Sequence, residues 1–203
     1  MKDLRNELIA TLKGENKALK ELNNIYLKEL EKGVRPIPTV KDNKVVGEIK
    51  SFLFKNGETY DIQFADNNGV LVFVDAIFEA PFDDKEDWTK CTNNWDKCTL
   101  KPLLEKWWND NAPDELKNHY KIDLLESEHI FPSSKQLEIF KNWKNRIKGL
   151  KGNDCATWWW TKTPYPTFAY FVRGISASGA LNLDGAHNGN GVVPACVPIT
   201  ESK

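Results

Sequence analysis

The sequence has few of the residues that usually mark a metal centre, a disulfide framework or a membrane segment. Of its 203 residues, 3 are histidine and 4 are cysteine. No stretch approaches the roughly 18 consecutive apolar residues of a membrane span. The 28 basic and 29 acidic side chains nearly cancel, leaving a formal net charge of -1. We therefore expect no membrane span and no broad electrostatic attraction to nucleic acid or to an anionic membrane surface.

The spacing of the cysteines argues against a zinc site. Cys91, Cys98, Cys155 and Cys196 lack the paired CxxC pattern and have no cluster of histidines beside them. We expect mostly buried free thiols, and we predict no metal or other cofactor. A disulfide between Cys91 and Cys98 is the alternative in an oxidising environment, because a gap of six residues permits it.

Residues 1–33 carry a leucine stripe within a charged segment. The stripe recurs at steps of three, four and seven residues, at Leu4, Leu8, Leu12, Leu19 and Leu22. This periodicity predicts an N-terminal helical arm, used for oligomerisation or docking or else packed on its own domain. The segment lacks the apolar core of a signal peptide, so we expect synthesis in the cytoplasm. We also expect a homo-oligomer.

The pattern changes after Gly33, and Pro36 and Pro38 predict an extended linker over residues 34–44. Residues 45–203 are then of a size suited to one domain. Within them, residues 45–54, 59–64 and 70–78 resemble strands separated by turns that contain Gly57 and Gly69. These turns predict a three-stranded antiparallel meander.

Helical patterns follow an acidic, irregular segment over residues 81–97. In that segment we expect Trp88 and Trp95 to anchor the loop on the core, and Asp83 and Asp84 to be solvated. Thr99 is placed to cap a helix over residues 100–109. Its inner side would carry Leu103, Leu104, Trp107 and Trp108. A short helix is expected after Pro113, and residues 134–148 have helical periodicity.

Residues 158–171, WWWTKTPYPTFAYF, are the stretch around which the chain is organised. Two prolines exclude a surface helix, so we expect an extended, partly buried segment. Alternating residues then predict a hairpin that turns near Gly179, and residues 192–199 a final apolar strand. The stretch supports a recognition surface or simply an ordinary β-core. The order of elements indicates an α+β fold in which the first and last strands pair.

Several ordered motifs resemble an uncharacterised bacterial and phage domain family. They are NWDKCTLKPLL at 94–104, EHIFPS at 128–133, WWTKTP at 159–164, AYFV at 169–172 and GVVPA at 191–195. The resemblance implies a C-type-lectin-like domain, with antiparallel β-hairpins around two or three helices. It also implies a relationship to the formylglycine-generating enzyme superfamily and to the variable proteins of diversity-generating retroelements. Thr161, Lys162 and Val193 depart from the Leu, Arg and Arg of the family pattern.

In the diversified relatives, polar positions of the C-terminal segment form the exposed ligand face. Carried over to matching positions, the resemblance implies a ligand-binding set of Tyr165, Thr167, Phe168, Arg173, Asn182, Asp184, His187, Asn188 and Asn190. Aromatic and Asn-rich surfaces suit this role, because they combine rigid contact area with adaptable hydrogen bonding. Asp184 and its neighbouring asparagines could also offer oxygens to a hard cation, although a polar turn is the commoner use of such residues.

No residue pattern supports catalysis, since none of the histidines lies in a nucleophile or metal motif. The leading hypothesis is a non-catalytic recognition module that binds a host-surface protein or glycan. By resemblance it could be a virion-associated receptor-binding protein of a phage tail, joined to other virion or tail proteins through the N-terminal helix. The alternative is a structural component of a virion or injection machine that assembles through that helix. A third hypothesis, an enzyme of the superfamily, would require a metal or a reactive thiol.

Overall fold

The computed structural model describes residues 45–199. The predicted helical arm and linker, residues 1–33 and 34–44, lie outside the described residues. Within the described residues the fold is mixed α+β, with most of its regular structure in β-sheets and few helices. The predicted α+β class is therefore confirmed. No helix of residues 45–199 is both long enough and apolar enough to cross a membrane.

The first sheet has the strand order β1-β2-β3-β12-β5. Its strands are β1 (Ile49–Leu53), β2 (Thr59–Phe64), β3 (Leu71–Phe73), β12 (Pro194–Pro198) and β5 (Tyr120–Leu124). The predicted meander is confirmed, since β1, β2 and β3 pair antiparallel in sequence. Gly57 and Gly69 adopt φ values of 83° and 89° in the two turns, a region that favours glycine.

The predicted pairing of the first and last strands is wrong. Strand β12 lies between β3 and β5, while β1 forms an edge of the sheet. Burial explains this order, because Ala195 and Cys196 of β12 are fully buried whereas Ile49 and Leu53 of β1 are exposed. The more apolar strand takes a central place and the amphipathic one takes the edge.

The second sheet has the order β10-β9-β8-β11-β4. Its strands are β10 (Leu181–Gly185), β9 (Phe171–Ile175), β8 (Trp159–Pro164), β11 (Gly189–Gly191) and β4 (Glu79–Pro81). The predicted hairpin is β9–β10, which turns at Gly179 with φ 80°. A separate two-stranded sheet pairs β6 (Lys148–Gly149) with β7 (Ala156–Thr157).

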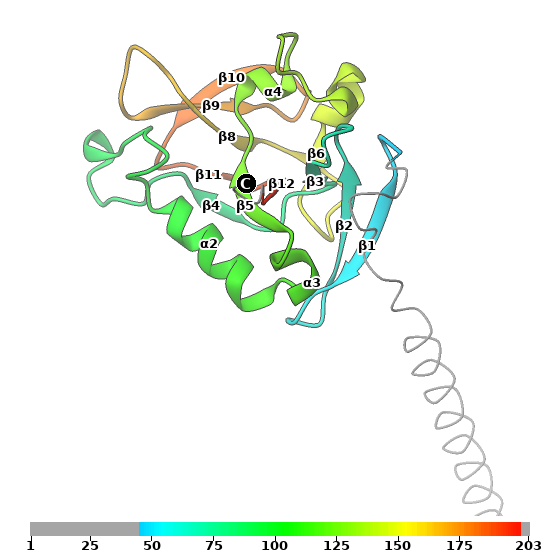
Figure 1. Cartoon of the computed structure of the whole chain (residues 1–203). Helices are drawn as coiled ribbons and strands as arrows, with labels where there is room; N and C mark the ends of the chain where they lie inside the picture. The colour runs from blue at the N-terminus through cyan, green and yellow to red at the C-terminus, as the bar shows by residue number, and fades with distance from the viewer. Residues whose placement is uncertain (1–44, 200–203) are drawn as a thin grey trace, which may run out of the picture. The chain divides into compact units, whose positions relative to one another are not determined.

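Within residues 45–199, three α-helices and three 3-10 helices lie between the strands. They are α2 (Leu100–Asn111), α3 (Asp114–Lys117), α4 (Ser127–Ile130), η1 (Trp88–Lys90), η2 (Glu138–Lys141) and η3 (Trp143–Arg146). Figure 1 shows α2 beneath β4 and beside β5. The helix buries Leu100, Leu104 and Trp108, but Leu103 is 48% exposed, so the prediction for Leu103 is wrong.

The continuous helical periodicity over residues 134–148 does not produce one helix. It is divided into η2 and η3 at Asn142, whose backbone is extended at φ -80° and ψ 107°. The Asn142 side chain accepts a hydrogen bond from the backbone N–H of Lys144. Asparagine readily makes such local bonds in competition with the helix, which accounts for the interruption.

Trp159 and Trp160 of β8 hold the core together from adjacent positions. Neighbouring strand residues point to opposite faces, so the two indoles enter different clusters. Trp159 stacks on Phe140 with ring centroids 6.5 Å apart, and Trp160 meets Phe82 at 5.8 Å. Their Nε1–H groups donate to the carbonyls of Arg146 and Ala80, both at 2.9 Å. The predicted extended, buried character of this stretch is confirmed for β8.

Candidate recognition face

The loop that joins β8 to β9 is held by a single side chain from elsewhere in the sequence. The Asn93 amide Nδ2 donates to the backbone carbonyls of Tyr165, Phe168 and Phe171 at 2.9, 3.1 and 3.0 Å. The loop also closes on itself, because the Tyr165 N–H donates to the Phe171 carbonyl at 3.2 Å. Its aromatic side chains are therefore presented from a backbone with a defined conformation.

Asp83 organises the segment that carries Asn93. Its Oδ2 accepts from the Thr92 N–H at 2.8 Å and its Oδ1 accepts from the Thr99 N–H at 3.1 Å. Lys85 lies 3.2 Å from the same carboxylate. Asp83 is fully buried, so the expectation of a solvated Asp83 is wrong. A buried carboxylate requires such partners. Because Asp83 accepts from both Thr92 and Thr99, it holds residues 92–99 against its own position in the chain.

Trp88 lies at the tip of this segment, in η1. Asp87 caps η1 by accepting from the Thr89 N–H at 3.1 Å and from its hydroxyl at 2.6 Å. These bonds from Thr89 hold the pKa of Asp87 below its usual value. Trp95 packs on the core beside Phe82, as predicted, but Trp88 is 49% exposed and does not anchor the loop.

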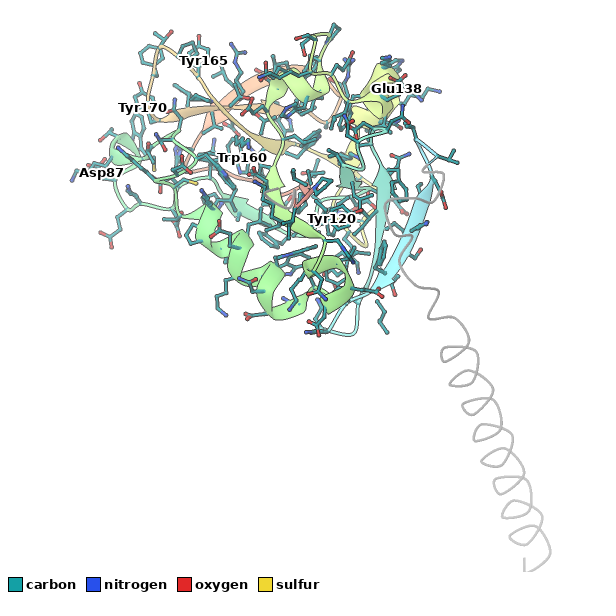
Figure 2. The ribbon with its side chains drawn as sticks, viewed as in Figure 1. Asp87, Tyr120, Glu138, Trp160, Tyr165 and Tyr170 are labelled. Carbon is teal, nitrogen blue, oxygen red and sulfur yellow. The ribbon has the colours of Figure 1, made fainter. Side chains whose placement is uncertain are left out.

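The segment that carries Trp88 and the loop between β8 and β9 contact each other through their aromatic rings. Trp88 contacts Tyr170 edge-on at 5.2 Å and lies 5.9 Å from the His187 ring. Phe168, which is 45% exposed, lies 5.7 Å from Tyr170 and 6.4 Å from Tyr165. We call this surface the aromatic face. It comprises Trp88, Tyr165, Phe168, Tyr170, Phe171, Arg173 and His187. Figure 2 shows Tyr165 and Tyr170 at the end of the domain where Asp87 lies, with Glu138 at the other end.

The side-chain polar groups of the aromatic face have no hydrogen-bond or ion-pair partner among residues 45–199. The Arg173 guanidinium lies over the Tyr165 ring at 5.7 Å. Within residues 45–199 it has no carboxylate within 4.0 Å, and each ion pair found there uses a lysine instead. The side-chain polar atoms of Trp88, Tyr165, Tyr170 and His187 likewise make no hydrogen bond to described residues. Aromatic side chains whose N–H and O–H groups make no hydrogen bond within the described residues are suited to contact another molecule.

Asp184, Asn188 and Asn190 form a separate, internally bonded group. Asp184 Oδ1 accepts from Asn188 Nδ2 at 2.6 Å and from the Gly185 N–H at 2.8 Å. Its Oδ2 accepts from Asn190 Nδ2 at 3.0 Å. Asn190 is only 7% exposed, which differs from its predicted place on an exposed face. The amides donate to the carboxylate, so the group braces the turn between β10 and β11 and offers no cage of oxygens to a cation.

The structure thus brings together part of the predicted ligand-binding set. Tyr165, Phe168, Arg173 and His187 belong to the aromatic face, and exposed Thr167 lies in the same loop. Asn182 is exposed on β10, where its Oδ1 accepts from the Leu183 N–H at 2.9 Å. The sequence prediction missed Trp88, Tyr170 and the supporting Asn93. No local pattern marks Asn93, because its acceptors lie more than seventy residues further along the chain.

The cysteine thiols are free, and most of them are buried. All four cysteines are free, and Cys91, Cys98 and Cys196 are buried while Cys155 is exposed. Burial raises the pKa of the Cys91, Cys98 and Cys196 thiols, so they are protonated at neutral pH. The expectation of mostly buried free thiols is confirmed, and Cys91 and Cys98 are not bridged.

One cluster of possible metal ligands lies outside the aromatic face. Glu126, Glu128 and His129 bring their ligand atoms within 4.8 Å of one another. Burial lowers the pKa of His129, which favours a neutral imidazole. Two of the groups already have partners, since His129 Nδ1 accepts from the Glu126 N–H at 3.2 Å and Glu128 pairs with Lys135. The His129 contact caps the start of α4.

A groove of about 470 Å³ lies between α2, β5 and β8. Its lining is strongly charged, but Lys162 pairs with Asp123 at 2.6 Å and Lys101 pairs with Asp96 at 2.5 Å. The groove therefore presents paired charges over much of its wall, in contrast to the unpaired Arg173 of the aromatic face.

Part of the chain is similar to a known protein family. Residues 114–197 match a domain of unknown function, DUF6273. The matched region is less than half of the chain. It contains β5 and β8 to β11 with most of the aromatic face, but not Trp88 or Asn93. No curated protein and no solved structure matches the chain. The similarity therefore supports an uncharacterised domain family without naming an activity.

Proposed function

We propose that this protein is a non-catalytic recognition module that binds a protein or a glycan through the aromatic face. The observation that carries the proposal is a contiguous group of exposed and half-buried rings, most of them on two loops that hydrogen bonds hold in place. Exposed apolar patches are costly in a soluble domain and commonly mark interaction sites. Loops fixed on a rigid scaffold lose little conformational entropy on binding, which favours affinity.

We further propose that the domain is C-type-lectin-like and serves host attachment as a virion-associated protein. The sequence motifs that resemble the bacterial and phage family support this setting. The arrangement of elements supports the fold, because antiparallel hairpins before and after the central helices agree with the hairpins around two or three helices that the resemblance implies. On this proposal Asp184 and Asn190 support the turn, whereas Trp88, Phe168 and Arg173 contact the ligand.

Two tryptophans with matched exposure provide a direct test. Trp88 is 49% exposed on the aromatic face, and Trp143 is 54% exposed in η3. Figure 2 shows Glu138 of the neighbouring η2 at the other end of the domain from Tyr165 and Tyr170. We expect Trp88→Ala to weaken adsorption to bacterial cells or binding to arrayed glycans by about 30-fold, the effect of losing an interface hot spot.

Trp143→Ala should bind as the wild type does. Circular dichroism and thermal unfolding of both variants serve as the control for folding. Equal binding by wild type and folded Trp88→Ala would refute the assignment of the ligand to the aromatic face.

A further inference from the structure

The uncommitted polar groups of the aromatic face are mostly hydrogen-bond donors. Arg173 offers up to five N–H donors and no acceptor, and the Trp88 indole offers one donor and no acceptor. Two carboxylates beside the face, those of Asp87 and Asp184, already have partners within the domain. Asp87 accepts twice from Thr89, and Asp184 accepts from three groups. The face therefore suits a ligand that supplies acceptors and negative charge.

The Arg173 guanidinium lies against an aromatic ring of the β8–β9 loop. Its Cζ lies over the Tyr165 ring at 5.7 Å, within the range of a cation–π contact. Asn93 fixes the Tyr165 backbone beneath it. A planar guanidinium can make two parallel hydrogen bonds to a carboxylate, whereas a lysine ammonium acts as a point charge.

From this excess of donors we infer that the aromatic face binds an acidic segment of a protein, with Arg173 pairing with a carboxylate of the partner. The inference rests on the proposed recognition function and names the partner class. Tryptophan, tyrosine and arginine are the residues that dominate protein interfaces energetically. Neutral glycans require acceptors as well as donors at their hydroxyl groups, and the Asp184 carboxylate already accepts three hydrogen bonds within the domain.

A displayed library of random peptides, panned against the full chain, tests the partner class. A glycan array that includes sialylated glycans is probed in parallel. We expect the selected peptides to be enriched in Asp and Glu. Arg173→Gln should weaken their binding in solution by about 10-fold or more, as expected for a lost charge-assisted hydrogen bond. Arg173→Lys should restore only part of the affinity, because it keeps the charge without the planar group.

Lys121→Gln is the control for charge, since it also removes one positive charge from the surface of the domain, at an exposed lysine outside the aromatic face. It should bind the peptides as the wild type does. Raising the salt concentration should weaken wild-type binding more than binding by Arg173→Gln, because salt screens an exposed ion pair.

The outcomes separate the two proposals. Peptides that require Trp88 but show no acidic enrichment, or that bind Arg173→Gln and wild type equally, would overturn the acidic-partner inference and leave the recognition function standing. Glycan binding through the aromatic face, without peptide binding, would also overturn the acidic-partner inference and leave the recognition function standing. If no selected peptide and no arrayed glycan depends on Trp88, both the inference and the proposed function fail.

Discussion

Lys148 should make the folded domain less stable at neutral pH than at mildly alkaline pH. The side chain is almost completely buried, and its Nζ donates to the Phe73 carbonyl at 3.2 Å. Burial lowers its pKa from 10.5 to about 8. At about 1.4 kcal/mol per pH unit, holding this amine charged in the fold costs about 3 kcal/mol at pH 7.

The sign follows from which state binds the proton. Below pH 8 both the folded and unfolded states carry the charge, and the folded state bears the full cost. Between about pH 8 and pH 10.5 the unfolded chain keeps a proton that the folded chain has lost, so stability rises with pH. Burial also raises the pKa of Tyr60 to about 12, which works in the opposite direction above pH 10. The test therefore compares the free energy of unfolding of the wild type with that of a variant that lacks the Lys148 amine.

Lys148→Met removes the charge and keeps the length of the side chain. Losing the bond to Phe73 costs about 1 kcal/mol, so the variant should be about 2 kcal/mol more stable than wild type at pH 7. That advantage should disappear towards pH 10. Urea unfolding followed by tryptophan fluorescence at several pH values measures both effects. A variant less stable than wild type at pH 7, with an unchanged pH profile, would refute the reasoning.

Three further substitutions test how the aromatic face is supported. Asn93→Ala should speed amide hydrogen exchange in residues 165–171 by about 10-fold while costing about 1–2 kcal/mol of global stability; unchanged exchange would contradict its role as the loop support. Asp83→Asn should cost about 1–3 kcal/mol, because the new amide group faces a backbone donor where the carboxylate accepted; an unchanged urea midpoint would contradict this. Trp160→Ala should cost about 3–5 kcal/mol through loss of a fully buried indole, whereas a loss below about 1 kcal/mol would contradict its central place in the core.

Local turn chemistry and hydrophobic pattern predicted much of this fold. Glycines at positions 57, 69 and 179 marked turns that all have positive φ. The prolines near the three adjacent tryptophans indicated an extended segment, and β8 follows there with Trp159 and Trp160 buried. These features depend on residues close together in the sequence, so a single sequence reveals them.

The pairing of strands distant in the sequence, and the side-chain contacts between distant segments, could not be predicted from local sequence patterns. The position of β12 between β3 and β5 depends on competition among strands for the buried centre of the sheet. Helical periodicity over residues 134–148 did not reveal that Asn142 would divide the segment. The candidate site was predicted only in part, because Trp88 and Asn93 reach the β8–β9 loop from a distant segment.

Fluorine NMR of the full chain labelled with 5-fluorotryptophan tests the central claim most directly, because it reports each tryptophan separately. Assignments come from single Trp→Phe variants at positions 88 and 143. On addition of a peptide or glycan selected against the wild type, the Trp88 resonance should shift or broaden while the Trp143 resonance stays unchanged. A shift at Trp143 with none at Trp88 would contradict recognition through the aromatic face.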